Sequence, residues 1–502
     1  MSDQAFQAVA MIVYFGGMLL IGWYAYRRTK DLGDYMLGGR DLGPAVAALS
    51  AGASDMSGWL LMGLPGAIYA AGLVEGWIAV GLTVGAWLNW RFVAPRLRGY
   101  TQVSNNSITI PSFLENRLKD RSRLLRVASG LIILTFFTFY VSSGMVAGGV
   151  FFESSFGMEY RHGMLLVAAV TVAYTLFGGF LAVSYTDFVQ GLMMFLALIA
   201  VPLVGLSATG GPGGVIASVR EVDPALLSAT STATVMGVVS ALAWGLGYFG
   251  QPHIIVRFMA IRSVREATSA RRIGIGWMAL SVLGAIATAL VGVAYFQQQG
   301  LTLDDPETVF IALGQILFHP LLAGFMLAAV LAAIMSTVSS QLLVTSSALV
   351  EDLYRMVVRS NASDRFLVLL GRGAVLLVSL VAAAMAWTQN DTILGLVAFA
   401  WAGFGAAFGP TILLSLYWRR LTVAGALAGM VVGAVAVGIW GNVDGGIFDL
   451  YEIVPGFVLN LLVAVVVSVL THRRNPAIEA EFDAALAMLE KQEKEEEEAL
   501  EA

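Results

Sequence analysis

Asp55 is the residue of this sequence whose position most demands a chemical explanation. It is the only charged residue in an apolar stretch that runs from about Gly43 to Ala71. The segment S50-A-G-A-S-D-M-S-G-W-L-L-M-G-L-P-G-A67 surrounds it with serines, glycines and a proline, which interrupt helices. A break in a membrane helix offers free carbonyl oxygens to a cation and free N–H groups to an anion. The expected chemistry is binding of a hard cation such as Na⁺ and of a substrate carboxylate.

Two structural explanations of Asp55 compete with a role in ion use. The carboxylate could pair with a basic side chain, or it could lie buried as a neutral acid. No Arg or Lys lies deep within an apolar stretch, since Arg91, Arg257 and Arg372 lie near the ends of such stretches. A charge at the bilayer centre costs at least about 2.5–3.5 kcal/mol. The sequence therefore favours Asp55 as a direct ion ligand or as a nearby carboxylate that attracts the ion.

A second apolar stretch is interrupted in a similar way. The segment W244-G-L-G-Y-F-G-Q-P-H253 combines three glycines with a glutamine and a proline. The structural alternative is a kink for helix packing, because small residues are common where membrane helices touch. Trp59 and Trp244 each flank one interruption, which favours a shared binding site between two broken helices.

A polar cluster lies in a third apolar stretch, at Ser336, Thr337, Ser339, Ser340 and Gln341. Hydroxyl and main-chain oxygens suit Na⁺. The same hydroxyls could instead bond to their own helix or to a neighbouring one, and the cluster alone does not decide between these roles.

Two further charged residues stand near the ends of apolar stretches. Asp187 either stabilises the first turn of a helix or is a station on an inward ion path. Arg40 is interpreted as an ordinary basic residue of a cytoplasmic loop.

These residues lie in a chain whose composition is that of a helical membrane protein. Of its 502 residues, 58% are hydrophobic and 13% are charged, whereas soluble domains carry roughly 25% charge. There is no Cys, which excludes disulfides and thiolate metal sites. Apolar stretches of about 20 residues recur along the whole chain. We expect about thirteen transmembrane helices, near 6–26, 43–71, 76–95, 124–150, 163–182, 186–208, 233–259, 273–296, 320–348, 366–388, 393–418, 422–441 and 453–471.

Basic residues are distributed unevenly between the loops. They cluster in the loops that follow the first, third, seventh, ninth, eleventh and thirteenth expected helices. The loops on the opposite side of the membrane hold mostly acidic residues. The positive-inside rule then places the N-terminus outside and the C-terminus in the cytoplasm. We expect an integral protein of a bacterial inner membrane, because no targeting signal is evident. The acidic tail is expected to be a solvated helix or a disordered segment.

The two interrupted helices lie five helices apart and run in opposite directions. Two five-helix units of inverted topology have this arrangement, and transporters built in this way bind substrate near the bilayer midplane. The predicted division is an extra N-terminal helix with a basic loop (1–42), a first repeat (43–208), an outer loop (209–232), a second repeat (233–418), two C-terminal helices (419–474) and an acidic cytoplasmic tail (475–502).

The stretches around both interruptions resemble the sodium:solute symporter family, and within it the branch that transports proline. Further matching stretches are L37-G-G-R40, G178-G-F-L-A-V-S184, A270-R-R-I273 and A400-W-A-G-F-G-A-A-F-G-P410. The resemblance covers nearly the whole chain. It implies an all-α membrane protein with the leucine-transporter fold, in which one helix precedes a ten-helix inverted-repeat core and two follow it. One departure is Ser340, where relatives carry a cysteine.

The resemblance also implies which residues form the sites. A Na⁺ site would use the main-chain carbonyls of Ala53, Met56 and Ala333 with the hydroxyls of Ser336 and Thr337. Asp55 and Ser57 are implied in Na⁺ use, and Asp187 in Na⁺ passage. Contacts with proline are implied at Ser57, Trp59, Gly63, Tyr140, Trp244, Tyr248 and Pro252.

We therefore expect a symporter, not an enzyme, that imports L-proline with co-transported Na⁺ by alternating access. The alternative within transport is Na⁺- or H⁺-coupled uptake of another small zwitterionic or carboxylate solute. A membrane sensor would need a signalling domain, and an intramembrane enzyme would need a metal pattern or a nucleophile–base pair. The expected partners are L-proline and the lipid bilayer, without nucleic acid, and a monomer is expected.

Overall fold

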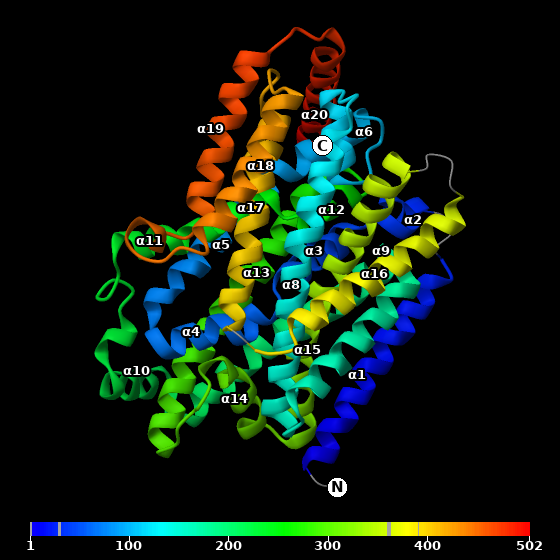
Figure 1. Ribbon diagram of the computed structural model, residues 1–502. Coiled ribbons are helices and arrows are strands. Elements are labelled where there is room, and N and C mark those ends of the chain that lie inside the picture. The colour runs from blue at the N-terminus through cyan, green and yellow to red at the C-terminus, as the bar shows by residue number, and fades with distance from the viewer. Residues whose placement is uncertain (1–2, 29–31, 359–362, 390, 502) are drawn as a thin grey trace.

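The computed structural model describes residues 3–28, 32–358, 363–389 and 391–501, and over these residues the protein is a bundle of helices (Figure 1). These residues contain no β-strand; one isolated bridge joins Leu42 and Ile261. Nine of the described helices are long and apolar enough to cross a membrane. They are α1 (Asp3–Tyr26), α8 (Leu124–Phe156), α9 from Gly179 onward, α13 (Val264–Gln299), α15 (Pro320–Ser347), α16 (Asp364–Met385), α17 (Ile393–Tyr417), α18 (Val423–Trp440) and α19 (Ile453–Thr471).

Four further segments complete the thirteen predicted spans. Two are the interrupted helices, and the other two are the first part of α9 (Tyr160–Ala208) and the helix that begins at α5. The latter runs as α5 (Gly76–Leu88), a π-helical turn η4 (Asn89–Val93) and α6 (Ala94–Val103), so it extends beyond its predicted end. The prediction of an all-α, thirteen-helix bundle with a leucine-transporter-like core is confirmed.

One predicted loop is absent. The sequence placed a connection between helices at 163–182 and 186–208, whereas in α9 the two helices meet at Gly179 with no loop between them. The chain changes direction at Gly179, whose φ of 58° and ψ of −153° are accessible to glycine and strained for other residues. The first repeat therefore ends in two helices that join at a glycine rather than through a polar turn.

Short helices connect the spans, and most were not predicted. They are α2 (Leu32–Leu37), η1 (Gly38–Arg40), η3 (Leu73–Glu75), α7 (Ile110–Leu118), α10 (Gly211–Val222), η5 (Pro224–Leu227), η7 (Pro306–Thr308), α14 (Val309–Leu317), η8 (Ala348–Val358) and η9 (Gly446–Asp449). One of them caps a long helix: the carboxylate of Glu307 in η7 accepts the N–H groups of Ile393 and Leu394, 3.0 and 3.3 Å away. These are among the N–H groups at the start of α17 that have no partner within the helix.

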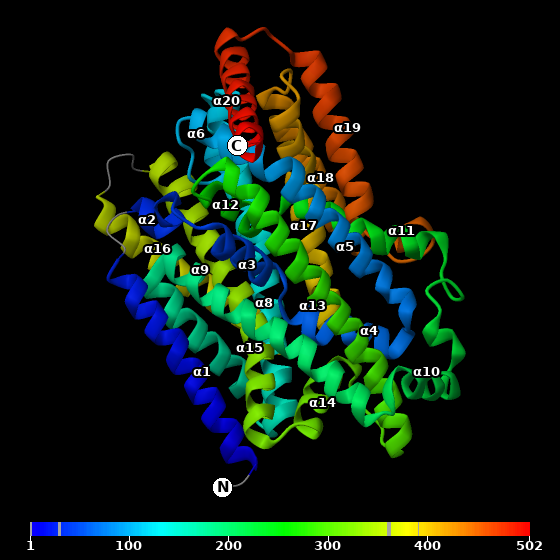
Figure 2. The same cartoon turned by 180° about the vertical axis from the view of Figure 1, so that it is seen from behind.

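The acidic tail forms α20 (Pro476–Glu501), which lies at the end of the bundle opposite the N-terminus (Figure 2). Phe482 is 4% exposed, and its ring packs edge-on against Tyr100, with the ring centroids 6.0 Å apart. Glu481 and Asp483 form ion pairs with Lys119 and Arg419. The helical tail is therefore docked on the bundle along this part, and the expectation of a fully solvated segment is wrong.

Glycines bring the third span into backbone contact with the second interrupted helix. A Cβ on Gly85 would lie 2.3 Å from the carbonyl oxygen of Gly245, and a Cβ on Gly81 would lie 2.5 Å from that of Leu242. Small residues permit this close approach of helices in a membrane. The second interrupted helix is thus held by direct backbone packing.

Gly85→Ala is expected to destabilise the protein by about 1–3 kcal/mol, because the methyl group must push two backbones apart. Gly276→Ala is the matched control, since a Cβ there meets nothing within 4 Å. Thermal unfolding of the purified variants in detergent would measure the difference. Equal midpoints for the two variants would contradict the close packing.

Candidate functional site

The first break lies between α3 (Pro44–Asp55) and the π-helical turn η2 (Trp59–Gly63), which continues as α4 (Leu64–Ala71). Met56 has φ −81° and ψ 76°, outside the helical region. The N–H of Ser57 bonds to the carbonyl of Asp55, 2.9 Å away, and not to that of Ala53 as a continuing helix would require. The break therefore frees the carbonyl oxygen of Ala53 from the helix ladder.

The freed carbonyl of Ala53 faces the predicted hydroxyl pair of α15. Ser336 Oγ donates to it over 2.7 Å, and Thr337 Oγ1 lies 3.4 Å from it. Both hydroxyls also reach the carbonyl of Ala333 in their own helix, at 3.1 and 3.3 Å. Four of the five oxygens predicted for Na⁺ therefore converge, and Met56 lies in the unwound segment beside them. The two alternative roles of the hydroxyls, within and between helices, are both realised.

Asp55 joins the two breaks. Its side chain is 1% exposed, and its Oδ2 accepts a hydrogen bond from the hydroxyl of Tyr248 in the second interrupted helix. Its Oδ1 has no hydrogen-bond partner in the described part of the chain. The main-chain carbonyl of Asp55 accepts the indole N–H of Trp59 over 3.0 Å. The carboxylate thus has one oxygen committed to the protein and one oxygen available.

The second break consists of α11 (Val235–Ala243), a tightened 3₁₀ segment η6 (Trp244–Gly250), extended Gln251 and α12 (Pro252–Ala260). Trp401 of α17, which sequence reasoning did not single out, holds this segment. Its indole N–H donates to the carbonyl of Trp244 over 2.7 Å, and its own carbonyl accepts from Gln251 Nε2 over 3.0 Å. A Cβ on Gly247 would lie 1.9 Å from Trp401 Nε1, so glycine is required there.

The predicted substrate residues are buried around the two breaks. Tyr248 contacts the ring of Trp401 edge-on, with the centroids 5.1 Å apart. Tyr140, on α8, is 1% exposed and its hydroxyl has no hydrogen-bond partner among the described residues. Trp59 and Ser57 adjoin the first break, whereas Trp244 begins the 3₁₀ segment of the second break and stacks on Tyr451, with the ring centroids 5.3 Å apart. The site therefore combines aromatic faces with a buried phenol.

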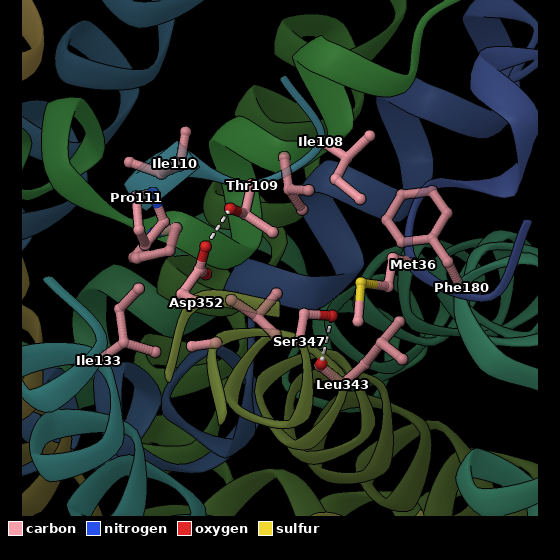
Figure 3. Close-up of a pocket in the computed structure, with 14 residues that line it drawn as sticks. Met36, Ile108, Thr109, Ile110, Pro111, Ile133, Phe180, Leu343, Ser347 and Asp352 are labelled. Atoms are coloured by element: carbon pink, nitrogen blue, oxygen red, sulfur yellow. Dashed lines mark hydrogen bonds between the residues drawn. The ribbon is translucent and has the colours of Figure 1, made fainter. Parts of the chain in front are cut away.

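The two remaining predicted substrate residues lie at helix ends, since Gly63 ends η2 and Pro252 begins α12. A Cβ on Gly63 would lie 3.3 Å from the Cβ of Leu394, so η2 passes close to α17 there. Pro252 begins α12 and lines a cavity that also touches Val256, Leu343 and Asp352. Figure 3 shows this cavity between the 108–111 segment and α15, with Thr109 donating to Asp352 over 2.8 Å.

Asp187 is not in the first turn of a helix. It lies well inside α9 with a side chain that is 0% exposed. Its Oδ2 accepts from Ser50 (2.7 Å), Arg257 (3.1 Å) and Ser340 (3.3 Å). The helix-dipole explanation of Asp187 is therefore wrong, because the carboxylate joins α3, α9, α12 and α15 in one buried network.

The ion pair between Arg257 and Asp187 could not be predicted from the sequence. The sequence placed it near the end of a span, yet its side chain is fully buried and bonds to Asp187, Ser50 and Ser340. It is therefore a basic residue within the bundle, and it pairs with Asp187 rather than with Asp55.

Arg40 is more than a solvated loop residue. Its guanidinium donates to the carbonyl of Met259 (3.0 Å) and to the hydroxyl of Thr101 (3.3 Å). Burial, with Arg98 nearby, lowers the pKa of Arg40 to about 10, so the group stays protonated at neutral pH. Arg40 thereby ties η1 to the end of α12 and to α6.

Two oppositely running interrupted helices that meet inside a bundle define a secondary transporter built from inverted repeats. The chain belongs to the sodium:solute symporter family, whose profile matches residues 35–433. It is 62% identical over 467 residues to the high-affinity proline transporter PutP of Bacillus subtilis, covering 93% of this chain and 98% of the relative. It is 50% identical over 493 residues to a sodium/proline symporter of Staphylococcus aureus, covering 96% of each chain.

Solved structures support the same fold. A Na⁺-coupled sialic acid symporter, in a substrate-bound outward-open state, superposes with a TM-score of 0.80 at 19% identity, covering 94% of this chain and 99% of that chain. Mhp1, a nucleobase-cation-symport-1 family transporter in a closed conformation, gives 0.59 at 15% identity, covering 90% and 98%. At these identities the likeness concerns the fold.

Proposed function

We propose that this protein imports L-proline together with Na⁺ by alternating access. The observation that carries the proposal is the meeting of the freed Ala53 carbonyl with the Ser336 and Thr337 hydroxyls beside the carboxylate of Asp55. The names of the proline-transporting relatives support the choice of substrate. The transporter lies in a bacterial plasma membrane with its N-terminus outside and its C-terminus in the cytoplasm, and it acts as a monomer.

Na⁺ is held where α3 ends and α15 passes. The carbonyls of Ala53, Met56 and Ala333 and the hydroxyls of Ser336 and Thr337 are neutral oxygens, which suit a monovalent hard cation. Asp55 adds a negative charge from the same break. Because the ligands belong to α3 and α15, a bound ion fixes these two helices relative to each other.

Proline binds next to the ion, on the other side of the first break. Its carboxylate lies near Ser57 and Trp59 at the start of η2, where the positive end of the helix dipole favours an anion. Its secondary ammonium and compact ring pack against the faces of Tyr140, Tyr248 and Trp244. The hydrogen bond between Tyr248 and Asp55 links the residues that bind proline to those that bind Na⁺.

Ion release follows the buried network at Asp187. This carboxylate shares Ser50 with α3 and Ser340 with α15, the two helices that the ion joins. Its Oδ1 has no hydrogen-bond partner within the described residues. It therefore offers a second negative oxygen to an ion that leaves Asp55.

Uptake of radiolabelled L-proline into proteoliposomes, with and without an inward Na⁺ gradient, tests the proposal. Uptake that requires the Na⁺ gradient is expected. Uptake driven by a pH gradient without Na⁺ would show that H⁺, and not Na⁺, is the coupling ion. No uptake of proline under any gradient would overturn the substrate, and a panel of other small zwitterions and carboxylates would follow.

A further inference from the structure

Two arginines at the tail end of the bundle line an open hollow that the transport site does not use. The hollow, of about 320 Å³, lies between η4, the start of α6, the end of α17 and the docked helix α20. Its lining residues are Arg91, Phe92, Pro95, Arg96, Tyr417, Leu486, Leu489 and Glu490. It therefore combines positive charge with aromatic and aliphatic surface.

Neither arginine forms an ion pair with a carboxylate of the described residues. Arg91 only approaches the ring of Phe92, with Cζ 5.6 Å from the centroid. Arg96 lies over Tyr417 at 3.9 Å and donates one Nη1 bond to the carbonyl of Leu416, 3.1 Å away. Arg96 is thus held in position by neutral groups, and both guanidinium groups retain donors for an anion.

A stripe of exposed apolar side chains leads directly to the hollow. Val80, Val84 and Trp87 are 45%, 51% and 45% exposed, and their spacing places them on one face of α5. Arg91 follows Trp87 by four residues and continues that face. In a chain with this many membrane-spanning helices, such an exposed apolar stripe faces acyl chains.

We propose that this hollow binds the headgroup of an anionic phospholipid, whose acyl chains lie along the α5 stripe. The phosphodiester is the anion that the paired arginines recognise, because guanidinium groups bind phosphate oxygens through several donors. Tyr417, 43% exposed, has the amphipathic ring that suits the headgroup level, and Phe92, also 43% exposed, adds apolar surface. Basic pockets between membrane helices are known sites for anionic headgroups in general.

The α20 helix gives this site a further wall. Leu486 and Leu489 contribute apolar surface, and Glu490 also lines the hollow but forms no ion pair with either arginine among the described residues. A bound headgroup therefore contacts both the transport bundle and the docked tail. This inference does not depend on the transported solute.

The test uses the purified full-length protein in a neutral detergent. Retention of dioleoyl phosphatidylglycerol, dioleoyl phosphatidylcholine and inorganic phosphate is measured by native mass spectrometry. Preferential retention of phosphatidylglycerol is expected, and Arg91→Gln is expected to weaken it about fivefold, with about 20-fold for Arg91→Gln plus Arg96→Gln. The single variant guards against misfolding, because Arg91 makes no hydrogen bond that the fold needs.

Arg161→Gln is the matched control. Arg161 is exposed and also lies over an aromatic ring, that of Trp387, with Cζ 4.9 Å from the centroid, but it does not line this hollow. Its retention of phosphatidylglycerol should equal that of the wild type. Equal retention of both lipids would overturn the proposal, and so would retention of phosphatidylglycerol by Arg91→Gln at the wild-type level. Inorganic phosphate that competes as well as the lipid would also overturn it, by assigning the site to free phosphate.

Discussion

Replacing Asp55 by asparagine is expected to raise the Na⁺ concentration that half-saturates proline uptake by about 100-fold. The amide keeps the size of the side chain and can still accept the Tyr248 hydroxyl, so the main change is the lost charge. Two unit charges about 4 Å apart interact by about 4 kcal/mol at the effective dielectric of a protein, and the interaction weakens with distance, so a loss of about 3 kcal/mol is expected. Each 1.4 kcal/mol is a tenfold change in affinity. Uptake as a function of external Na⁺ measures the shift.

Asp444→Asn is the control for loss of an acid from the surface, since Asp444 lies in an exposed loop. Its Na⁺ dependence should match that of the wild type. A normal Na⁺ response in Asp55→Asn would leave Asp55 with a structural role alone. Tyr248→Phe separates the two functions of the break, because it keeps the charge and removes the hydrogen bond that joins the two interrupted helices.

The positions of the breaks could be predicted because their causes are local. Glycine, proline and serine beside Asp55 disfavour a continuous helix, and the same holds for the segment that contains Gly247 and Pro252. The thirteen spans could be predicted for a related reason, since apolar length is visible in the sequence. The division into inverted repeats followed from the parity of those spans.

The partners across the bundle could not be predicted. Tyr248 meets Asp55 across 193 positions, and Arg257 meets Asp187 across 70. Such pairs depend on how helices pack, which leaves no local mark in one sequence. Trp401 was missed for the same reason, since its indole acts on the second break from a helix that looks uniformly apolar.

The misjudged tail and the missing loop have different causes. Phe482 is one apolar residue in a strongly charged segment, so the charge dominated the interpretation of 475–502. At Gly179 a positive φ turns the chain without the polar residues that usually mark a loop. In both places a single residue determines the local structure, although the composition of the surrounding segment predicts a different one.

The double substitution Ser336→Ala plus Thr337→Ala is expected to remove most of the coupling to Na⁺. Each hydroxyl lies within hydrogen-bond distance of the freed carbonyl of Ala53, at 2.7 and 3.4 Å. An interaction with a charged group is worth about 1.5–3 kcal/mol, so loss of both raises the half-saturating Na⁺ concentration by about 10²–10⁴-fold. Proline binding in the absence of Na⁺ should change far less, because the two hydroxyls face the proposed Na⁺ ligands rather than the aromatic residues proposed to bind proline.

Thr345→Ala provides the matched control for this change. Thr345 has a buried hydroxyl on the same helix, but among the described residues this hydroxyl bonds only to the carbonyl of Gln341, 2.7 Å away in that helix. Both proteins therefore lose buried hydroxyl groups, and only the double variant loses the link from α15 to the first break. Calorimetric titration with Na⁺ and with proline would separate the two ligands. Normal Na⁺ affinity in the double variant would mean that the ion binds elsewhere, whereas a loss shared with Thr345→Ala would assign the effect to the packing of α15.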